Sequence, residues 1–143
     1  IVGHPAMGTG EVGKLVAKPE NWEKVYIIGY KSCSFDGNGK LPAQSQAFVD
    51  SVKGKIRLDD TSLWWVLSGV DAIRLIAEAV QKSGSTDSDK IIAHWNTVKN
   101  WNGLYGHYSF SPTDHNGFHG DDIVMQRANS QKDGAFAIAP GYA

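Results

Sequence analysis

Only one of the 143 residues is a cysteine, Cys33, so the chain cannot form an internal disulfide bond. It also lacks an apolar run of the about eighteen residues that a membrane-spanning helix needs, because residues 63–80, the longest candidate, contain charged and polar side chains. Neither sign of charge is in excess, since 14 Lys and Arg balance 15 Asp and Glu, and the basic residues are scattered. These absences exclude a membrane span and argue against a surface that follows nucleic-acid phosphates.

The composition that remains is typical of one globular domain. Hydrophobic residues make up 41% of the chain and charged residues 20%, which excludes a disordered polymer. The 16 glycines and 5 prolines indicate too many turns for a plain helical bundle. The chain opens with Ile1, without an initiator Met or a signal-like segment, and this predicts a processed or truncated product.

A long helix is the clearest predicted element. Several candidate N-caps (Asp59, Asp60, Thr61 and Ser62) precede it, and Gly84 is a typical helix end. Apolar residues recur within it at spacings of three and four, and we expect them to form one core-facing stripe. They are Leu63, Val66, Val70, Ile73, Ala77 and Val80.

The other predicted elements complete an α/β pattern. We expect a strand over residues 25–30 that is buried on both faces, a helix beginning near Pro42 and a helix over residues 88–99 with a cap within residues 85–87. Two apolar runs, residues 123–127 and 135–138, flank a Lys-Asp-Gly turn and predict a β-hairpin. These strands are too few for a complete doubly wound sheet.

Two local patterns suggest cofactor chemistry, and we assign neither to a cofactor. Gly8, Gly10 and Gly13 form a G-x-G-x-x-G string, but Pro19 leaves too short a helix after it for dinucleotide binding. A cluster of metal-binding residue types spans residues 107–122, although its spacing matches no helix-borne ligand pair and is typical of turns. A metal-dependent hydrolase that uses His107, His115 and His119 stays open as an alternative.

Tryptophan and cysteine give the remaining candidate site residues. Trp64 and Trp65 are adjacent, and neighbours on a helix are separated by about 100°, so we expect one in the core and the other facing a cleft. No partner that would lower the pKa of Cys33 is visible, so we expect a structural cysteine. Neither Ser, His and carboxylate residues nor Cys33 form a nucleophile pattern, so the chain is not expected to be an enzyme.

The order of several motifs is similar to that of one protein family. The motifs are Gly3-His-Pro, Lys-Pro-Glu-Asn-Trp22, Trp65-Val-Leu-Ser-Gly-Val-Asp-Ala-Ile73, Gly84-Ser-Thr-Asp, Gly103-Leu-Tyr-Gly106, Tyr-Ser-Phe-Ser-Pro112, Asp-His-Asn-Gly117 and Lys-Asp-Gly134. Together they resemble the carboxy-terminal portion of type I solute-binding proteins of ABC importers, the group that binds branched-chain amino acids, amides, urea and aromatic acids. The resemblance covers essentially the whole chain.

The resemblance implies an incomplete type I periplasmic-binding-protein-like fold with Rossmann-like lobes. Residues 1–30 would supply the end of the second lobe and a crossing, residues 31–105 the helices of the first lobe, and residues 106–143 a return segment with the hairpin. Parts of both lobes would be present and neither would be complete. Exposed strand edges and apolar helix faces would then make the fragment self-associate or pair with the missing amino-terminal part.

The family resemblance also implies a ligand site between the lobes. The loop after the first strand, His4-Pro5-Ala6, corresponds to a family ligand loop, and Trp65, or failing that Trp64, corresponds to an aromatic ligand contact. The loop has no carboxylate to pair with an ammonium group, which favours a carboxylate, amide or aromatic ligand over an α-amino acid.

The function that follows from the resemblance is solute capture without catalysis. The lobes would close on a small molecule, and a membrane permease would recognise the closed form. The implied location is the periplasm or the extracellular space. A ligand-sensing domain of a receptor or regulator stays open as another alternative, because it shares the fold.

Overall fold

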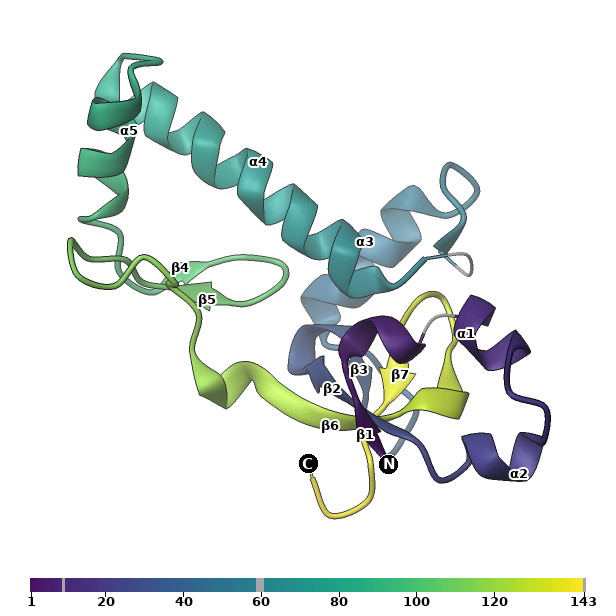
Figure 1. Ribbon diagram of the computed structural model, residues 1–143. Helices are drawn as coiled ribbons and strands as arrows, with labels where there is room; N and C mark the ends of the chain where they lie inside the picture. The colour runs from purple at the N-terminus through teal and green to yellow at the C-terminus, as the bar shows by residue number, and fades with distance from the viewer. Residues whose placement is uncertain (9, 59–60, 143) are drawn as a thin grey trace.

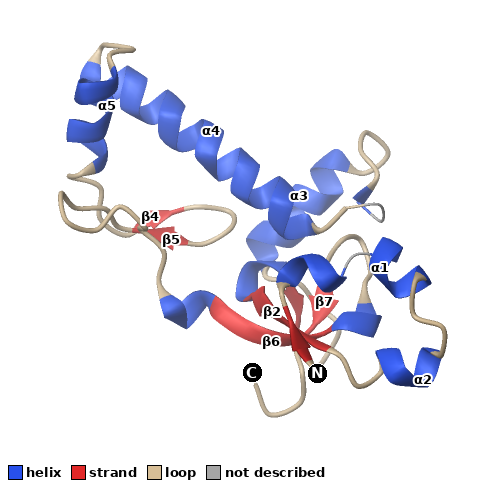
Figure 2. Ribbon diagram, in the orientation of Figure 1, coloured by secondary structure: helices blue, strands red, loops and turns tan. Residues whose placement is uncertain are grey.

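The computed structural model combines strands and helices and describes residues 1–8, 10–58 and 61–142 (Figure 1). The strands are β1 (Val2–Gly3), β2 (Tyr26–Tyr30), β3 (Ser34–Phe35), β4 (Trp101–Asn102), β5 (His107–Tyr108), β6 (Ile123–Arg127) and β7 (Phe136–Ala137). The α-helices are α1 (Gly10–Lys14), α2 (Pro19–Trp22), α3 (Ala43–Val52), α4 (Leu63–Ser83) and α5 (Ser88–Trp95). Figure 2 shows α4 running away from the β1–β2–β6 sheet to α5, with β4 and β5 beside it. The predicted α/β class is confirmed.

The main sheet is built around β2, which runs parallel to β1 and antiparallel to β6. Ile27 of β2 is fully buried in a cluster with Phe136, whereas Ile28 on the opposite face is 41% exposed. The predicted strand is therefore confirmed, but the prediction that it is buried on both faces is wrong. The face that carries Ile27 packs against this cluster, whereas on the opposite face Ile28 is exposed and Tyr30, at the end of the strand, is partly buried.

The predicted carboxy-terminal hairpin is wrong in its pairing and right in its turn. β6 pairs with β2, and β7 pairs with β3 in parallel. The two segments meet at an isolated antiparallel bridge between Gln126 and Ile138, where the Ala139 amide donates to the Met125 carbonyl (2.8 Å). The turn has positive φ at Asp133 (49°) and Gly134 (74°), which is the geometry that favours Asp-Gly. The Gly134 carbonyl then accepts a 2.7 Å hydrogen bond from the Leu63 amide, which ties the turn to the start of α4.

The long helix α4 is confirmed, and it ends at Gly84 in the left-handed conformation (φ 63°). Asp59 and Asp60 lie outside the described residues, and the Ser62 side chain makes no capping hydrogen bond. The predicted stripe is right at Leu63 and Val66, which contact the principal core, and wrong at Ile73, which is 70% exposed, and at Ala77, which is exposed. The buried row runs at intervals of four residues instead: Leu63, Leu67, Asp71, Leu75 and Ala79.

The second predicted helix is shorter than expected. α5 ends at Trp95, before the predicted end at residue 99. Its cap lies within the predicted range, because the Asp87 side chain accepts hydrogen bonds from the amides of Asp89 (3.1 Å) and Lys90 (3.2 Å). The Trp95 indole N–H donates to the Leu75 carbonyl (3.2 Å) and joins α5 to α4.

Asp71 is a buried carboxylate in the centre of the α4 row, with 1% of its surface exposed. It accepts hydrogen bonds from the amides of Leu104 (2.8 Å) and Tyr105 (2.7 Å) in the β4–β5 loop. A Cβ atom at Gly103 would collide with the carboxylate, so glycine is needed for this close approach. The predicted apolar stripe leaves Asp71 out, and these two amides compensate for the burial of its carboxylate.

We expect Asp71→Asn to lower the free energy of unfolding by about 2 kcal/mol, because hydrogen bonds to a charged group contribute about 1.5–3 kcal/mol. The asparagine amide also offers one acceptor oxygen where two N–H groups point. Urea denaturation followed by circular dichroism measures the change. Asp121→Asn, at an exposed aspartate, is the control. An equal loss of unfolding free energy in both variants would show that the two hydrogen bonds to Asp71 do not stabilise the fold.

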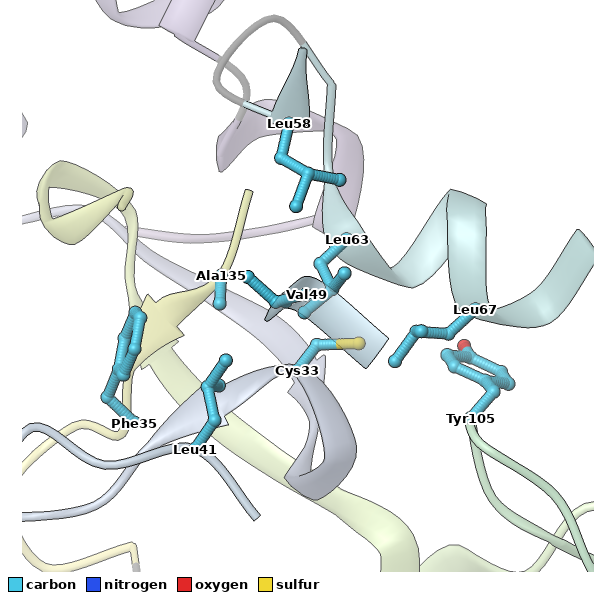
Figure 3. Close-up of a cluster of buried hydrophobic side chains, with 9 residues drawn as sticks. All are labelled: Cys33, Phe35, Leu41, Val49, Leu58, Leu63, Leu67, Tyr105 and Ala135. Carbon is cyan, nitrogen blue, oxygen red and sulfur yellow. The ribbon is translucent and has the colours of Figure 1, made fainter. Parts of the chain in front are cut away.

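The principal core lies between α3, α4 and the β3–β7 pair, and Figure 3 shows its nine buried side chains. Cys33 is among them, with 2% of its surface exposed. Burial raises the pKa of its thiol to about 12, while the Ser32 hydroxyl acts in the opposite direction. The predicted structural role of Cys33 is consistent with this burial.

The folded chain should react slowly with a thiol reagent such as iodoacetamide at pH 8. The raised pKa of Cys33 leaves almost no thiolate below about pH 11, and the side chain is enclosed. Mass spectrometry of labelled protein checks this, with the urea-unfolded chain as the control that reacts at the ordinary rate. Equal labelling rates in the two states would overturn the assignment.

Candidate functional site

Two segments that are distant in sequence meet at the first turn of α4. The His4 ring, in the loop after β1, lies edge-on to the Trp64 ring with 6.5 Å between their centroids. Tyr30, at the end of β2, lies at the same centroid distance from Trp64. The structure therefore brings together the predicted loop and the predicted aromatic position.

The two tryptophans stack on each other, with ring centroids 4.0 Å apart and an interplanar angle of 25°. Trp65 is 56% exposed, whereas Trp64 is half-buried and packs against the principal core. The rings therefore lie against each other although the two positions are separated by about 100° on the helix. Trp64 is the one that packs against the core, and whether Trp65 faces a ligand cleft stays a prediction.

Trp64 and His4 each present a ring N–H group at this site. The Trp64 indole nitrogen is inaccessible to solvent and has no hydrogen-bond partner among the described residues. The His4 Nδ1 atom accepts a hydrogen bond from the Ala6 amide (3.2 Å), so the neutral ring carries its proton on Nε2. A buried donor without a partner costs about 1–3 kcal/mol, and such a group in a native fold calls for an explanation.

The other residues of the predicted loop shape it. Pro5 is buried and Ala6 is half-buried, both in a 3₁₀ turn that spans residues 5–8. Gly8 ends this turn, and a Cβ atom there would collide with Ile27 and Phe136. Of the three predicted loop residues, His4 is thus the one with an exposed side chain.

The sequence analysis missed three aromatic residues that extend the cluster. Tyr30 lies 4.5 Å from Tyr105 and 5.2 Å from Phe118, measured between ring centroids. Burial, followed by the neighbouring Tyr30 hydroxyl, raises the pKa of Tyr105, so its phenol stays neutral. The one feature of the sequence that pointed to this aromatic cluster was the position of Tyr30 at the end of a predicted strand.

The histidine and aspartate cluster of residues 107–122 does not converge. His107 Nδ1 lies 3.5 Å from Asp122 Oδ1, and His115 lies away from them at an apolar groove between α4 and α5 of about 350 Å³. In the described ranges, no three His, Cys, Asp or Glu side chains are grouped to hold a metal ion. The hydrolase alternative therefore gains no support from the geometry.

The comparisons with known proteins agree with this fold. Residues 7–134 match the family described as periplasmic binding protein, and the chain belongs to this family. A crystal structure of a type 1 periplasmic binding protein from Bordetella pertussis Tohama I has a TM-score of 0.71 and 20% sequence identity to the chain. The fold is therefore the type 1 periplasmic-binding fold, as the resemblance implied.

The match to that structure is unequal in its coverage. It includes 97% of this chain and 38% of the other, so the described elements correspond to a part of the type 1 fold. No match is found among the curated proteins.

Proposed function

We propose that this chain is part of a solute-binding protein that captures a small molecule between two lobes and delivers it to the permease of an ABC importer. The main support is the meeting of the His4 loop with Trp64, because these segments correspond to opposite lobes in the resembled family. Membership of the periplasmic binding protein family supports the solute-binding role. The protein acts by binding and has no catalytic activity of its own.

The path of the chain supports the proposed division into lobes. Residues 1–30 end the second lobe and enter the first through β2, residues 31–105 carry α3, α4 and α5, and residues 106–143 return through β6. The two proposed crossings are adjacent, since β2 and β6 pair along five residues. Paired crossings of this kind let two lobes turn relative to each other about a common axis.

The proposed location is the periplasm or the extracellular space, where the family operates. In the described part of the chain, no helix combines the length and apolar character that crossing a membrane requires. The solute is a small polar or aromatic molecule, and the permease is the partner that recognises the closed form.

The tryptophan pair provides the direct test. In the longest natural polypeptide that contains this chain, we expect Trp64→Ala or Trp65→Ala to weaken solute binding by more than about tenfold at one of the two positions, because aromatic groups dominate ligand pockets. A thermal-shift screen of amino acids, amides and aromatic acids identifies a solute, and calorimetry measures its affinity. Trp22→Ala, on α2, is the control. Unchanged affinity in both variants would place the site elsewhere.

Exposed apolar residues support the proposed association of this chain. Ile73 and Ile76 on α4 are 70% and 48% exposed, and Ile92 on α5 is 44% exposed beside the groove between the helices. Val2 and Ile28 add apolar surface on the main sheet. Such surfaces in a soluble chain are typical of faces that another polypeptide covers.

We expect the isolated chain to self-associate, and static light scattering with size-exclusion chromatography measures its mass. Ile73→Glu should shift the equilibrium toward the monomer, because the charged side chain is costly to bury in an apolar contact. Ile56→Glu, at an exposed isoleucine outside α4 and α5, should leave the mass unchanged. A stable monomer at all concentrations would contradict the proposal.

A further inference from the structure

We propose that Asn116 is a site of spontaneous covalent modification, at which the side-chain amide is converted to a carboxylate through a cyclic succinimide. The chain contains three Asn-Gly sequences, at residues 38–39, 102–103 and 116–117. Glycine favours this ring closure because it has no Cβ atom to obstruct the approach of its backbone nitrogen to the preceding side chain. The three sequences are equivalent in this respect, and the structure selects Asn116. The inference is independent of the proposed solute-binding function.

The reaction needs only these two residues and water. The Gly117 nitrogen loses its proton to hydroxide and attacks Cγ of Asn116, so that a new N–C bond closes the ring. The C–N bond of the side-chain amide breaks, and its nitrogen takes up a proton and leaves as ammonia. Water then opens the ring at one of its two carbonyls, which returns an N–H to the main chain and gives aspartate or isoaspartate. The net change consumes one water, releases one ammonia and adds one negative charge.

The three candidate nucleophiles differ in their hydrogen bonds. The Gly39 amide donates to the Asp36 carbonyl (3.0 Å), and the Gly103 amide donates to the Gly106 carbonyl (2.9 Å). The Gly117 amide donates to no group in the part of the chain that the structure describes. A donated hydrogen bond must break before the nitrogen can lose its proton and turn toward the side chain, and breaking it costs free energy. Gly117 is therefore the nucleophile that reacts without this cost.

The amide that is attacked is also accessible. Asn116 is exposed, and its side chain makes no hydrogen bond within the described ranges, while its backbone amide donates to Asp114 Oδ1 (3.0 Å). The fold requires glycine at the next position, because Gly117 has a φ of 67° and a Cβ atom there would collide with the Phe110 ring. The glycine that makes Asn116 reactive is thus fixed by the packing of the loop between β5 and β6.

Isoaspartate at this position would disturb the aromatic cluster. The Gly117 carbonyl accepts a hydrogen bond from the Ser109 amide (2.9 Å), and the ring of the next residue, Phe118, lies 5.2 Å from that of Tyr30. Isoaspartate adds one carbon atom to the main chain just before Gly117, so it displaces this carbonyl and the Phe118 ring. Ordinary aspartate adds the charge and leaves the length of the main chain unchanged.

Peptide mapping by mass spectrometry compares the three sites in one sample of the purified chain at pH 8, because each conversion raises the mass of its peptide. Asn116 should convert about threefold to tenfold faster than Asn38 or Asn102, since each of those sites must first break a backbone hydrogen bond. The rate at Asn116 should fall at pH 5, where less of the nitrogen is deprotonated. In the urea-unfolded chain, which lacks these hydrogen bonds, the three rates should become similar.

Two variants separate the steps of the proposal. Asn116→Gln is the matched variant, because its longer side chain must close a six-membered ring, so the fast conversion should disappear while those at Asn38 and Asn102 persist. Asn116→Asp carries the charge on an ordinary main chain. The isoaspartate form, isolated by ion-exchange chromatography, should have a Tm about 4 °C below that of Asn116→Asp, because it loses the hydrogen bond from Ser109.

The opposite results are equally definite. Equal rates at the three sites of the folded chain, or a faster conversion at Asn38 or Asn102, would overturn the assignment to Asn116. Constant masses in the folded chain over a time in which the unfolded chain is converted would overturn it as well. Equal Tm values for the isoaspartate form and Asn116→Asp would contradict the displacement of the main chain. If Asn116→Gln does not fold, the relative rates in the unmodified chain decide.

Discussion

The buried carboxylate of Asp71 is the contact on which the helical part of this molecule depends. Its two hydrogen bonds to the Leu104 and Tyr105 amides fasten the β4–β5 loop to the middle of α4. Tyr105 is thereby placed against Tyr30, and Tyr30 in turn contacts Trp64. Two backbone N–H donors replace the water that would otherwise solvate this carboxylate. Through Tyr105 and Tyr30, the same contact fixes the position of the first turn of α4 relative to the sheet.

A second buried polar group joins the two crossing segments. The Gln126 amide of β6 donates to the Cys33 carbonyl (3.2 Å) and to the Ser34 hydroxyl (2.7 Å), just beyond the end of β2. Gly29 permits this, because a Cβ atom there would occupy the space of the glutamine side chain. The two proposed crossings are therefore linked by side-chain bonds as well as by their ladder. Bonds at this point hold the two proposed crossings against each other.

Local chemistry predicted the elements well and their partners poorly. The end of α4 at Gly84, the cap at Asp87 and the Asp-Gly turn each depend on a few neighbouring residues, and all three agree with the structure. The hairpin pairing failed because strand partners are chosen by segments distant in sequence, here β2 and β3. The predicted stripe of α4 omitted Asp71 because the amides that its carboxylate binds lie more than thirty positions away.

The candidate site shows the same division between local and distant information. Sequence reasoning selected His4, Trp64 and Trp65, but it had no means of finding that the tryptophan rings stack or that the indole N–H lacks a partner. Both features depend on how the loop after β1 and the end of β2 pack against the first turn of α4. The residue types of the candidate site can be read from the sequence, whereas the arrangement of their rings depends on segments that are distant along the chain.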